Sequence, residues 1–141
     1  MLNFALVGCG RISKRHSELL GHNQIKNAQL VAACDNIFEK ASNIGKQFNI
    51  PAYDNMDDMM LSEKIDVVAV LTPSGNHAKH VINLAKYGKH IMVEKPMALR
   101  LEDADSMIEA CDHNNCRLFV IKQNRFNVPV LKLYDAYKNG R

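Results

Sequence analysis

The chain has 141 residues, 47% of them hydrophobic and 23% charged, a balance that is typical of one ordinary globular domain. Its 18 basic and 15 acidic residues are interspersed, so neither a nucleic-acid-binding nor a lipid-binding surface is expected. The first residues show no leader pattern and no apolar stretch is long enough to span a bilayer, so we expect a cytoplasmic protein.

The first predicted element is a buried strand over the apolar residues 4–7, followed by a glycine turn and a helix from Ile12. Gly8 permits an unusual backbone conformation, and Gly10 removes a side chain that would keep a diphosphate away from the backbone. The N–H groups and positive dipole end of the helix favour the same ligand. Ser13 replaces the third glycine of the dinucleotide motif and is small enough for close packing of helix on strand. The pattern predicts a dinucleotide site, although a turn with two glycines need bind nothing.

A second buried strand is predicted over residues 30–34, and it ends at Asp35, which lies 25 residues after Gly10. An acid at this place in a dinucleotide-binding fold accepts hydrogen bonds from the adenosine ribose. The alternative is that Asp35 or Asn36 caps the helix that follows. Because a 2′-phosphate would meet a like charge at Asp35, the sequence also predicts that NAD is preferred over NADP.

The middle of the chain continues to alternate between helices and strands. Periodicity predicts a helix over 37–48, a short strand over 51–53, a helix over 54–63 whose methionines fill the core, and a strand over 66–71. Pro73 ends this last strand, and the small polar residues after it expose backbone at the carboxyl edge of the sheet. That edge is where open α/β sheets bind ligands.

His77 falls in the first turn of the next predicted helix, which ends at Gly88. A lone histidine there is either a packing residue or, because it lies beside the ligand edge, a contact to the cofactor. Both interpretations stay open at this stage. His80 and His90 have no such placement, and we interpret them as structural.

The fifth predicted strand, residues 90–93, runs directly into Glu94-Lys95-Pro96. A lysine head group at the end of a buried strand costs free energy unless it is paired or used. The alternative is a surface ion pair, which contributes little to stability. The sequence therefore favours Lys95 as a residue of the functional site.

A helix with Leu101 to Cys111 inward and a strand over 118–121 complete the pattern, and a further helix starts at Pro129. Strands that alternate with helices through right-handed crossovers predict an α/β fold with one doubly wound parallel sheet of the Rossmann type. We expect this domain to cover residues 1–125, and residues 126–141 to begin a crossover helix that leads toward another domain.

The four cysteines are expected to be free structural thiols. Cys9, Cys34, Cys111 and Cys116 form neither a C-x-x-C pair nor a set of ligands at zinc spacing. Two of them fall in or beside predicted strands, where cysteine behaves as a small hydrophobic residue. No metal site is predicted.

Taken together, the glycine turn with His16, Asp35, Thr72-Pro73 with His77, and above all Glu94-Lys95-Pro96 resemble the Gfo/Idh/MocA family, named after glucose-fructose oxidoreductase, inositol dehydrogenase and a rhizopine catabolism protein. The resemblance covers the whole chain. It implies that the lysine matching Lys95 lies beside the nicotinamide and the oxidised carbon, and that the acid matching Glu94 helps to seat the cofactor. The cofactor-binding residues expected from the pattern and the resemblance are Gly8, Gly10, Arg11, Ile12, Ser13, Asp35, Leu71, Thr72, Pro73, Asn76, His77, Glu94, Lys95 and Gln123.

The segment 122–127 is further similar to the branch of the family that oxidises C3 of UDP-N-acetylglucosaminuronic acid in lipopolysaccharide biosynthesis. This resemblance implies hydride transfer from a secondary carbinol to NAD, with Lys95 as the catalytic residue that handles the hydroxyl proton. Asn124 and Arg125 are candidates for contacting a sugar or sugar-nucleotide substrate, or for a structural role in the domain crossover.

The family also implies a second α/β domain after residue 141, with most substrate contacts, a further catalytic histidine and a homo-oligomer interface. Two other functions stay open: a non-catalytic NAD-binding module, and a dehydrogenase of the same family that acts on a free sugar or inositol. Retention of Lys95 argues against the module, because cofactor binding alone does not require a lysine there.

Overall fold

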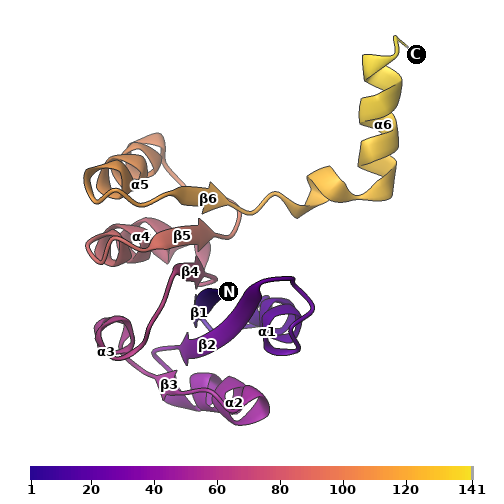
Figure 1. Cartoon of the computed structure of the whole chain (residues 1–141). Helices are drawn as coiled ribbons and strands as arrows, with labels where there is room; N and C mark the ends of the chain where they lie inside the picture. Colours follow the sequence, from indigo (N-terminus) through magenta and orange to yellow (C-terminus); the bar gives the residue numbers. More distant parts are fainter. Residues whose placement is uncertain (141) are drawn as a thin grey trace.

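The computed structural model describes residues 1–140, which form a six-stranded parallel sheet with helices on both faces (Figure 1). The strand order is β3-β2-β1-β4-β5-β6. The strands are β1 (Leu2–Val7), β2 (Ala28–Cys34), β3 (Ala52–Tyr53), β4 (Val67–Val70), β5 (His90–Val93) and β6 (Leu118–Val120). The predicted doubly wound α/β fold is therefore confirmed.

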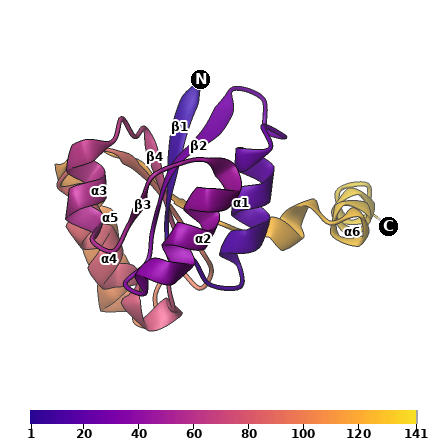
Figure 2. The ribbon, with the colours of Figure 1, turned by 90° about the horizontal axis from the view of Figure 1, so that it is seen from below.

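The helices form two layers that enclose the sheet. Figures 1 and 2 show α1 (Ser13–Gly21) and α2 (Phe38–Phe48) on one face, and α3 (Met56–Ser62), α4 (His77–Ala85) and α5 (Leu101–His113) on the other. Two short 3₁₀ helices, η1 (Ser74–Asn76) and η2 (Gln123–Phe126), follow β4 and β6. The predicted elements are present, with bounds that shift by a few residues.

Burial on both faces explains why the central strands read as continuous apolar runs. Every residue of β4 is buried, and alternate residues belong to different core clusters. Val68 and Val70 pack in the cluster beneath α3, α4 and α5, whereas Ala69 packs in the cluster beneath α1 and α2. Met59 and Met60 are buried in the first of these clusters, which confirms the prediction that the methionines of this helix fill the core.

The order of the strands fixes the place of the site. The chain moves from β1 outward to β2 and β3, and then returns to place β4 on the other side of β1. At this reversal the connections after β1 and β4 leave on opposite faces of the sheet, and a crevice opens between them. The glycine turn follows β1, and Thr72 and Pro73 follow β4, so both predicted motifs meet at this crevice.

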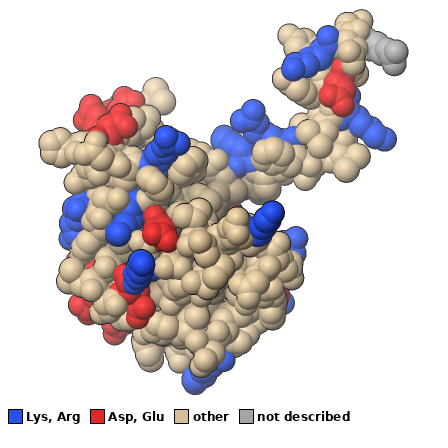
Figure 3. Space-filling model, viewed as in Figure 1, with Lys and Arg blue, Asp and Glu red and all other residues tan. Residues whose placement is uncertain are grey.

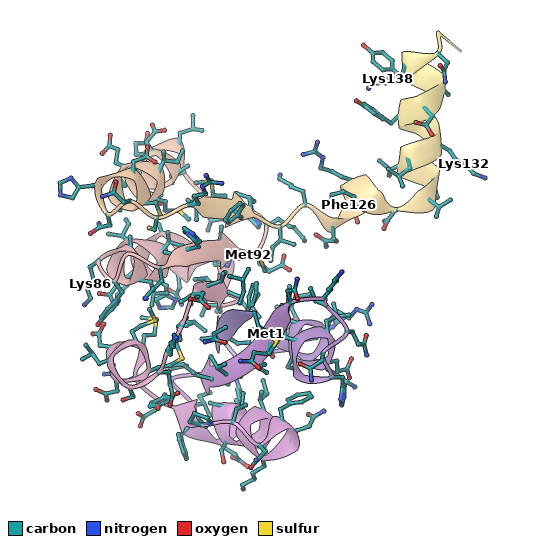
Figure 4. The ribbon with its side chains drawn as sticks, in the orientation of Figure 1. Met1, Lys86, Met92, Phe126, Lys132 and Lys138 are labelled. Atoms are coloured by element: carbon teal, nitrogen blue, oxygen red, sulfur yellow. The ribbon has the colours of Figure 1, made fainter. Side chains whose placement is uncertain are left out.

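The last helix, α6 (Val128–Lys138), stands away from the body of the domain on the side of α1 (Figures 1 and 2). Figure 4 shows Phe126, Lys132 and Lys138 projecting from η2 and α6, clear of the sheet. Phe126 is 77% exposed and Tyr137 is 80% exposed. The assignment of residues 126–141 to a crossover toward another domain stays a prediction, and Arg141 lies outside the described residues.

Charged side chains of both signs are mixed on the surface of the domain. Figure 3 shows basic and acidic side chains interspersed over the visible face of the domain body. Among residues 1–140, no helix has the length and apolar character needed to cross a bilayer. In the same residues, no group of three or more His, Cys, Asp or Glu side chains is arranged to hold a metal ion.

Candidate active site

Two cavities share walls at the carboxyl edge of the sheet. The larger has a volume of about 820 Å³ and the smaller a volume of about 260 Å³, and both are lined by Ile12, Leu71, Thr72 and Pro73. The larger is also lined by the predicted residues Gly8, Gly10, Arg11, Asp35 and Asn76, and the smaller by His77, Glu94, Lys95 and Gln123. The fold thus gathers most of the predicted site residues around two adjoining cavities.

The glycine turn has the backbone conformation that the sequence predicts. Gly8 has φ +96°, and a Cβ atom there would lie 2.8 Å from the backbone nitrogen of Thr72. A Cβ on Gly10 would meet no atom within 4 Å, so this glycine faces open space in the cavity. Gly8 therefore allows the close approach of two turns, and Gly10 leaves room for a ligand.

The start of α1 can bind an anion. Ile12 occupies the N-cap position and supplies no side-chain hydrogen bond. The N–H of Ser13 donates to the carbonyl oxygen of Gly10 at 3.1 Å, so the N–H groups left for a ligand are those of the residues that follow Ser13. Ser13 is 2% exposed, and its Oγ donates a hydrogen bond to the carbonyl oxygen of Gly10 at 2.6 Å. Its side chain lines neither cavity, so Ser13 holds the glycine turn against the helix.

Asp35 does not cap α2, whose N-cap is Ile37 without a side-chain hydrogen bond, and its contact with a ribose stays a prediction. Its Oδ1 accepts a hydrogen bond from the backbone nitrogen of Ile37 at 2.9 Å, which shapes the turn before α2. Its Oδ2 accepts one from the backbone nitrogen of Cys9 at 2.7 Å, which ties the end of β2 to the glycine turn. The carboxylate also lines the larger cavity, and each oxygen keeps a lone pair that can accept from a ribose hydroxyl.

His77 connects the turns that follow β4 and β5. It is 1% exposed, its Nδ1 lies 2.8 Å from the carbonyl oxygen of Pro96, and its Nε2 lies 2.7 Å from that of Thr72. Its ring nitrogens thus face backbone acceptors, and His77 is one of the residues that line the smaller cavity. This geometry favours a role in holding the two turns together.

Glu94 and Lys95 do not pair with each other. The Oε1 atom of Glu94 lies 3.2 Å from Nε2 of His16, and its Oε2 accepts a hydrogen bond from the backbone nitrogen of Lys95 at 3.0 Å. Glu94 is only 7% exposed, whereas Lys95 is exposed and has no ion-pair partner among the described residues. The alternative of a surface ion pair for Lys95 is therefore wrong within residues 1–140.

Several residues of the larger cavity have no counterpart in the sequence-based prediction. They are Val7, Cys34, Asn36, Lys40, Lys79, His80 and the segment 54–57. We interpreted His80 as structural, but it lines the cavity, and its Nδ1 lies 2.9 Å from Oγ1 of Thr72. One available signal was its spacing of three residues from His77, which places both on the same side of α4.

The residues after β6 divide into two groups. Gln123 lines the smaller cavity, as predicted for a cofactor contact. Asn124 and Arg125 lie in exposed positions of η2 and line neither cavity. The described residues therefore do not bring Asn124 and Arg125 to the site, and their contact with substrate stays a prediction.

The cysteines near the site are poor nucleophiles. Burial and the charge of Asp35 raise the pKa of Cys9 to about 12, and the same causes raise the pKa of Cys34 to about 12. All four cysteines are free, as predicted. The His90 prediction is also supported, because its Nδ1 accepts a hydrogen bond from the backbone nitrogen of Arg117 at 3.2 Å, away from both cavities.

The residues present fit a dinucleotide. Uncapped helix N–H groups and the open space over Gly10 suit a diphosphate, and the Asp35 carboxylate suits a ribose. A cavity of about 820 Å³ falls within the range of sites that bury most of a small ligand. The adjoining smaller cavity extends this space to Lys95.

Comparison with known proteins gives the same assignment. Residues 2–122 match the model of an oxidoreductase family described as having an NAD-binding Rossmann fold, Gfo/Idh/MocA. A myo-inositol 2-dehydrogenase of Thermotoga maritima is 31% identical over 140 residues, which are 99% of this chain and 41% of that protein.

Two solved structures are similar over the same length. The WlbA dehydrogenase of Bordetella pertussis, in complex with NADH and UDP-GlcNAcA, is 38% identical with a TM-score of 0.92, over 99% of this chain and 42% of that one. The WlbA dehydrogenase of Chromobacterium violaceum, with the same two ligands, is 36% identical with a TM-score of 0.93, over 99% and 40%. The chain thus spans about two fifths of the length of these relatives.

Proposed function

Because this chain belongs to the Gfo/Idh/MocA oxidoreductase family and forms an NAD-binding Rossmann domain, we propose that it is the cofactor-binding part of a dehydrogenase that oxidises a secondary hydroxyl of a sugar or sugar nucleotide. The observation that carries this proposal is the position of Lys95. Lys95 lines the cavity that adjoins the dinucleotide cavity, and no carboxylate forms an ion pair with it among the described residues.

Each part of the cofactor has residues that suit it. The backbone at Gly10 and the first turn of α1 hold the diphosphate, and Asp35 holds the adenosine ribose. Glu94 and Gln123 line the space left for the nicotinamide end. When bound there, NAD supplies the hydride acceptor.

Lys95 performs the part of the reaction that belongs to this chain. A secondary hydroxyl is a very weak acid, so its carbon releases hydride only if the oxygen loses its proton or gains a positive charge beside it. The Lys95 amine hydrogen-bonds this oxygen, accepts its proton when neutral, and as an ammonium stabilises the negative charge that develops. The backbone N–H of Lys95 is held by Glu94, which fixes the start of the turn.

For the substrate, we propose UDP-N-acetylglucosaminuronic acid, oxidised at C3 during lipopolysaccharide biosynthesis. The support is that two WlbA dehydrogenases crystallised with this compound are 36–38% identical to the chain. A free polyol is the second candidate, because the myo-inositol 2-dehydrogenase of Thermotoga maritima is 31% identical over nearly the whole chain.

The proposal places this chain in a longer, cytoplasmic enzyme. The rest of that enzyme supplies the remaining substrate contacts, a second catalytic residue and a homo-oligomer interface. The described residues contain no second acid or base beside Lys95 other than Glu94 and His77, and both of these make hydrogen bonds within the protein. A further domain over the smaller cavity supplies the missing groups.

The test is an assay of the complete gene product for NAD reduction at 340 nm, with UDP-N-acetylglucosaminuronic acid and myo-inositol offered separately. We expect NADH formation with the UDP-sugar acid and at least about tenfold lower kcat/KM with inositol, a difference of about 1.4 kcal/mol in transition-state binding. A higher kcat/KM with inositol than with the UDP-sugar acid would make a free polyol the substrate. Oxidation of neither, by an enzyme that binds NAD, would favour a non-catalytic module.

A further inference from the structure

One wall of the larger cavity is made by residues that belong to none of the recognised motifs. Lys79 and His80 of α4 contribute to it, together with residues 54–57 from the connection between β3 and α3. None of these residues lines the smaller cavity that contains Lys95. This wall therefore lies in the part of the site that is away from Lys95.

His80 makes a single side-chain hydrogen bond in this wall. Its side chain is half-buried, and its Nδ1 lies 2.9 Å from Oγ1 of Thr72. No hydrogen bond within the described residues involves its Nε2, so this nitrogen can donate to or accept from a ligand, depending on the tautomer.

The place of His80 follows from the order of groups in a dinucleotide, and this step rests on the proposed function. If the nicotinamide end lies at Lys95, the diphosphate lies at the glycine turn and the adenosine ribose at Asp35. The adenine base is the group that remains for the wall formed by α4 and residues 54–57. We propose that His80 binds the adenine end of NAD as a neutral imidazole, and that protonation of His80 opposes NAD binding.

The physical reason is the loss of water from around the ring. Desolvation already lowers the pKa of His80, and the positive charges of Lys79 and His77 act in the same direction. A planar base against the ring excludes more water and disfavours the imidazolium further. NAD whose adenine lies against the ring therefore lowers the pKa of His80 further.

Charged groups of both signs line the cavity around His80. The carboxylates that line the cavity with His80 are Asp35, Asp54 and Asp57, and the basic groups are Arg11, Lys40 and Lys79; of these, Lys79 lowers the pKa of His80. Helix α5, on the outer side of α4, contributes no residue to this cavity among residues 1–140. Because the free His80 has a lowered pKa, it is neutral at pH 7.5, and NAD affinity falls as the pH falls through that pKa.

The first test follows the histidine ring signals of the chain by NMR as a function of pH, with His80→Asn identifying the His80 resonance. AMP and NAD are each expected to lower the titration midpoint of His80 by about half a pH unit or more, equivalent to about threefold in affinity. Nicotinamide mononucleotide lacks the adenine and is expected to leave the midpoint unchanged. An unchanged or raised midpoint with AMP would overturn the inference.

The second test measures NAD affinity by calorimetry at pH 7.5 and pH 5.5. We expect the parent chain to bind at least about threefold more weakly at the lower pH, and His80→Asn, which keeps a polar group near Thr72, to lose most of this dependence. His90→Asn, at a histidine that lines neither cavity, is the matched control and should behave as the parent. If the parent binds NAD with equal affinity at both pH values, the inference about His80 is wrong but the proposed cofactor site is not affected. If the parent does not bind NAD at pH 7.5, the proposed cofactor site is wrong as well.

Discussion

The Nε2 atom of His16 lies 3.2 Å from Oε1 of Glu94, and this contact joins the helix that starts at the glycine turn to the turn that carries Lys95. The two residues are 78 positions apart in the chain. The side chain of Glu94 is 9% exposed, and its other oxygen is held by the backbone N–H of Lys95. The helix after the glycine turn and the turn that carries Lys95 are therefore held together through Glu94.

We predict that His16→Leu destabilises the domain, because it leaves Glu94 buried without one of its two partners. A buried group that loses its hydrogen-bond partner costs about 1–3 kcal/mol, measured as the free energy of unfolding in urea. His16→Gln places an amide nitrogen near the position of Nε2 and should recover most of the loss. Equal stability of His16→Leu and the parent would show that the contact contributes nothing.

A pair of glycine substitutions separates folding from binding. Gly8→Ala forces a side chain into φ +96° and within 2.8 Å of the backbone at Thr72, so we expect a loss of stability of about 1–3 kcal/mol. Gly10→Ala meets open space, so we expect near-parental stability and at least about tenfold weaker NAD binding, equivalent to about 1.4 kcal/mol.

The two measurements are thermal unfolding without ligand and calorimetric titration with NAD. If Gly10→Ala binds NAD as the parent does, the diphosphate does not approach the backbone at this glycine. If Gly8→Ala is as stable as the parent, the close approach of the two turns is not a constraint on the fold.

Asp35 is predicted to set the preference for NAD over NADP. A charge-assisted hydrogen bond contributes about 1.5–3 kcal/mol, so NAD should bind about 10- to 150-fold more tightly than NADP. Asp35→Asn keeps an acceptor for one of the two backbone N–H groups that Asp35 holds, and should narrow this ratio at least about threefold. Calorimetric titrations with both cofactors test this, and an NADP affinity equal to that of NAD in the parent would contradict it.

The thiols beside the site are predicted to be unreactive in the native state. With a pKa of about 12, the fraction of Cys9 or Cys34 present as thiolate at pH 8 is on the order of 10⁻⁴. Reaction with a disulfide reagent at pH 8 should therefore be slow in buffer and fast in denaturant. Rapid labelling of Cys9 in the folded chain would show that its thiol is not held in the protonated form.

Local patterns were sufficient to predict the sheet and the central motifs. The apolar runs before Gly8, Thr72 and Glu94 identify strands that are buried on both faces, and polar residues directly after parallel strands must meet at one edge of the sheet. The cavity residues from these three strand ends were therefore predictable without any contact information.

The contacts and cavity residues that the sequence did not predict depend on tertiary structure. His16 pairs with Glu94 because α1 packs beside the end of β5, and no local pattern encodes a contact between residues so far apart. Lys40 and residues 54–57 reach the larger cavity because α2 and the connection to α3 fold over the ends of the outer strands. His80 was assessed as an isolated histidine, whereas its role depends on Thr72, which precedes it by eight residues.

The central claim is that Lys95 handles the hydroxyl proton, and the complete enzyme with Lys95→Met tests it most directly. Methionine keeps an unbranched apolar side chain and removes the amine, so NAD affinity should stay within about threefold of the parent, a difference below about 1 kcal/mol. Removing a group of this kind lowers kcat by about 10²–10⁴. Measured NAD affinity near that of the parent, with kcat reduced to this extent, is the predicted result. A variant that keeps most of its turnover, or that loses NAD binding in proportion to its loss of kcat, would contradict the proton-handling role of Lys95.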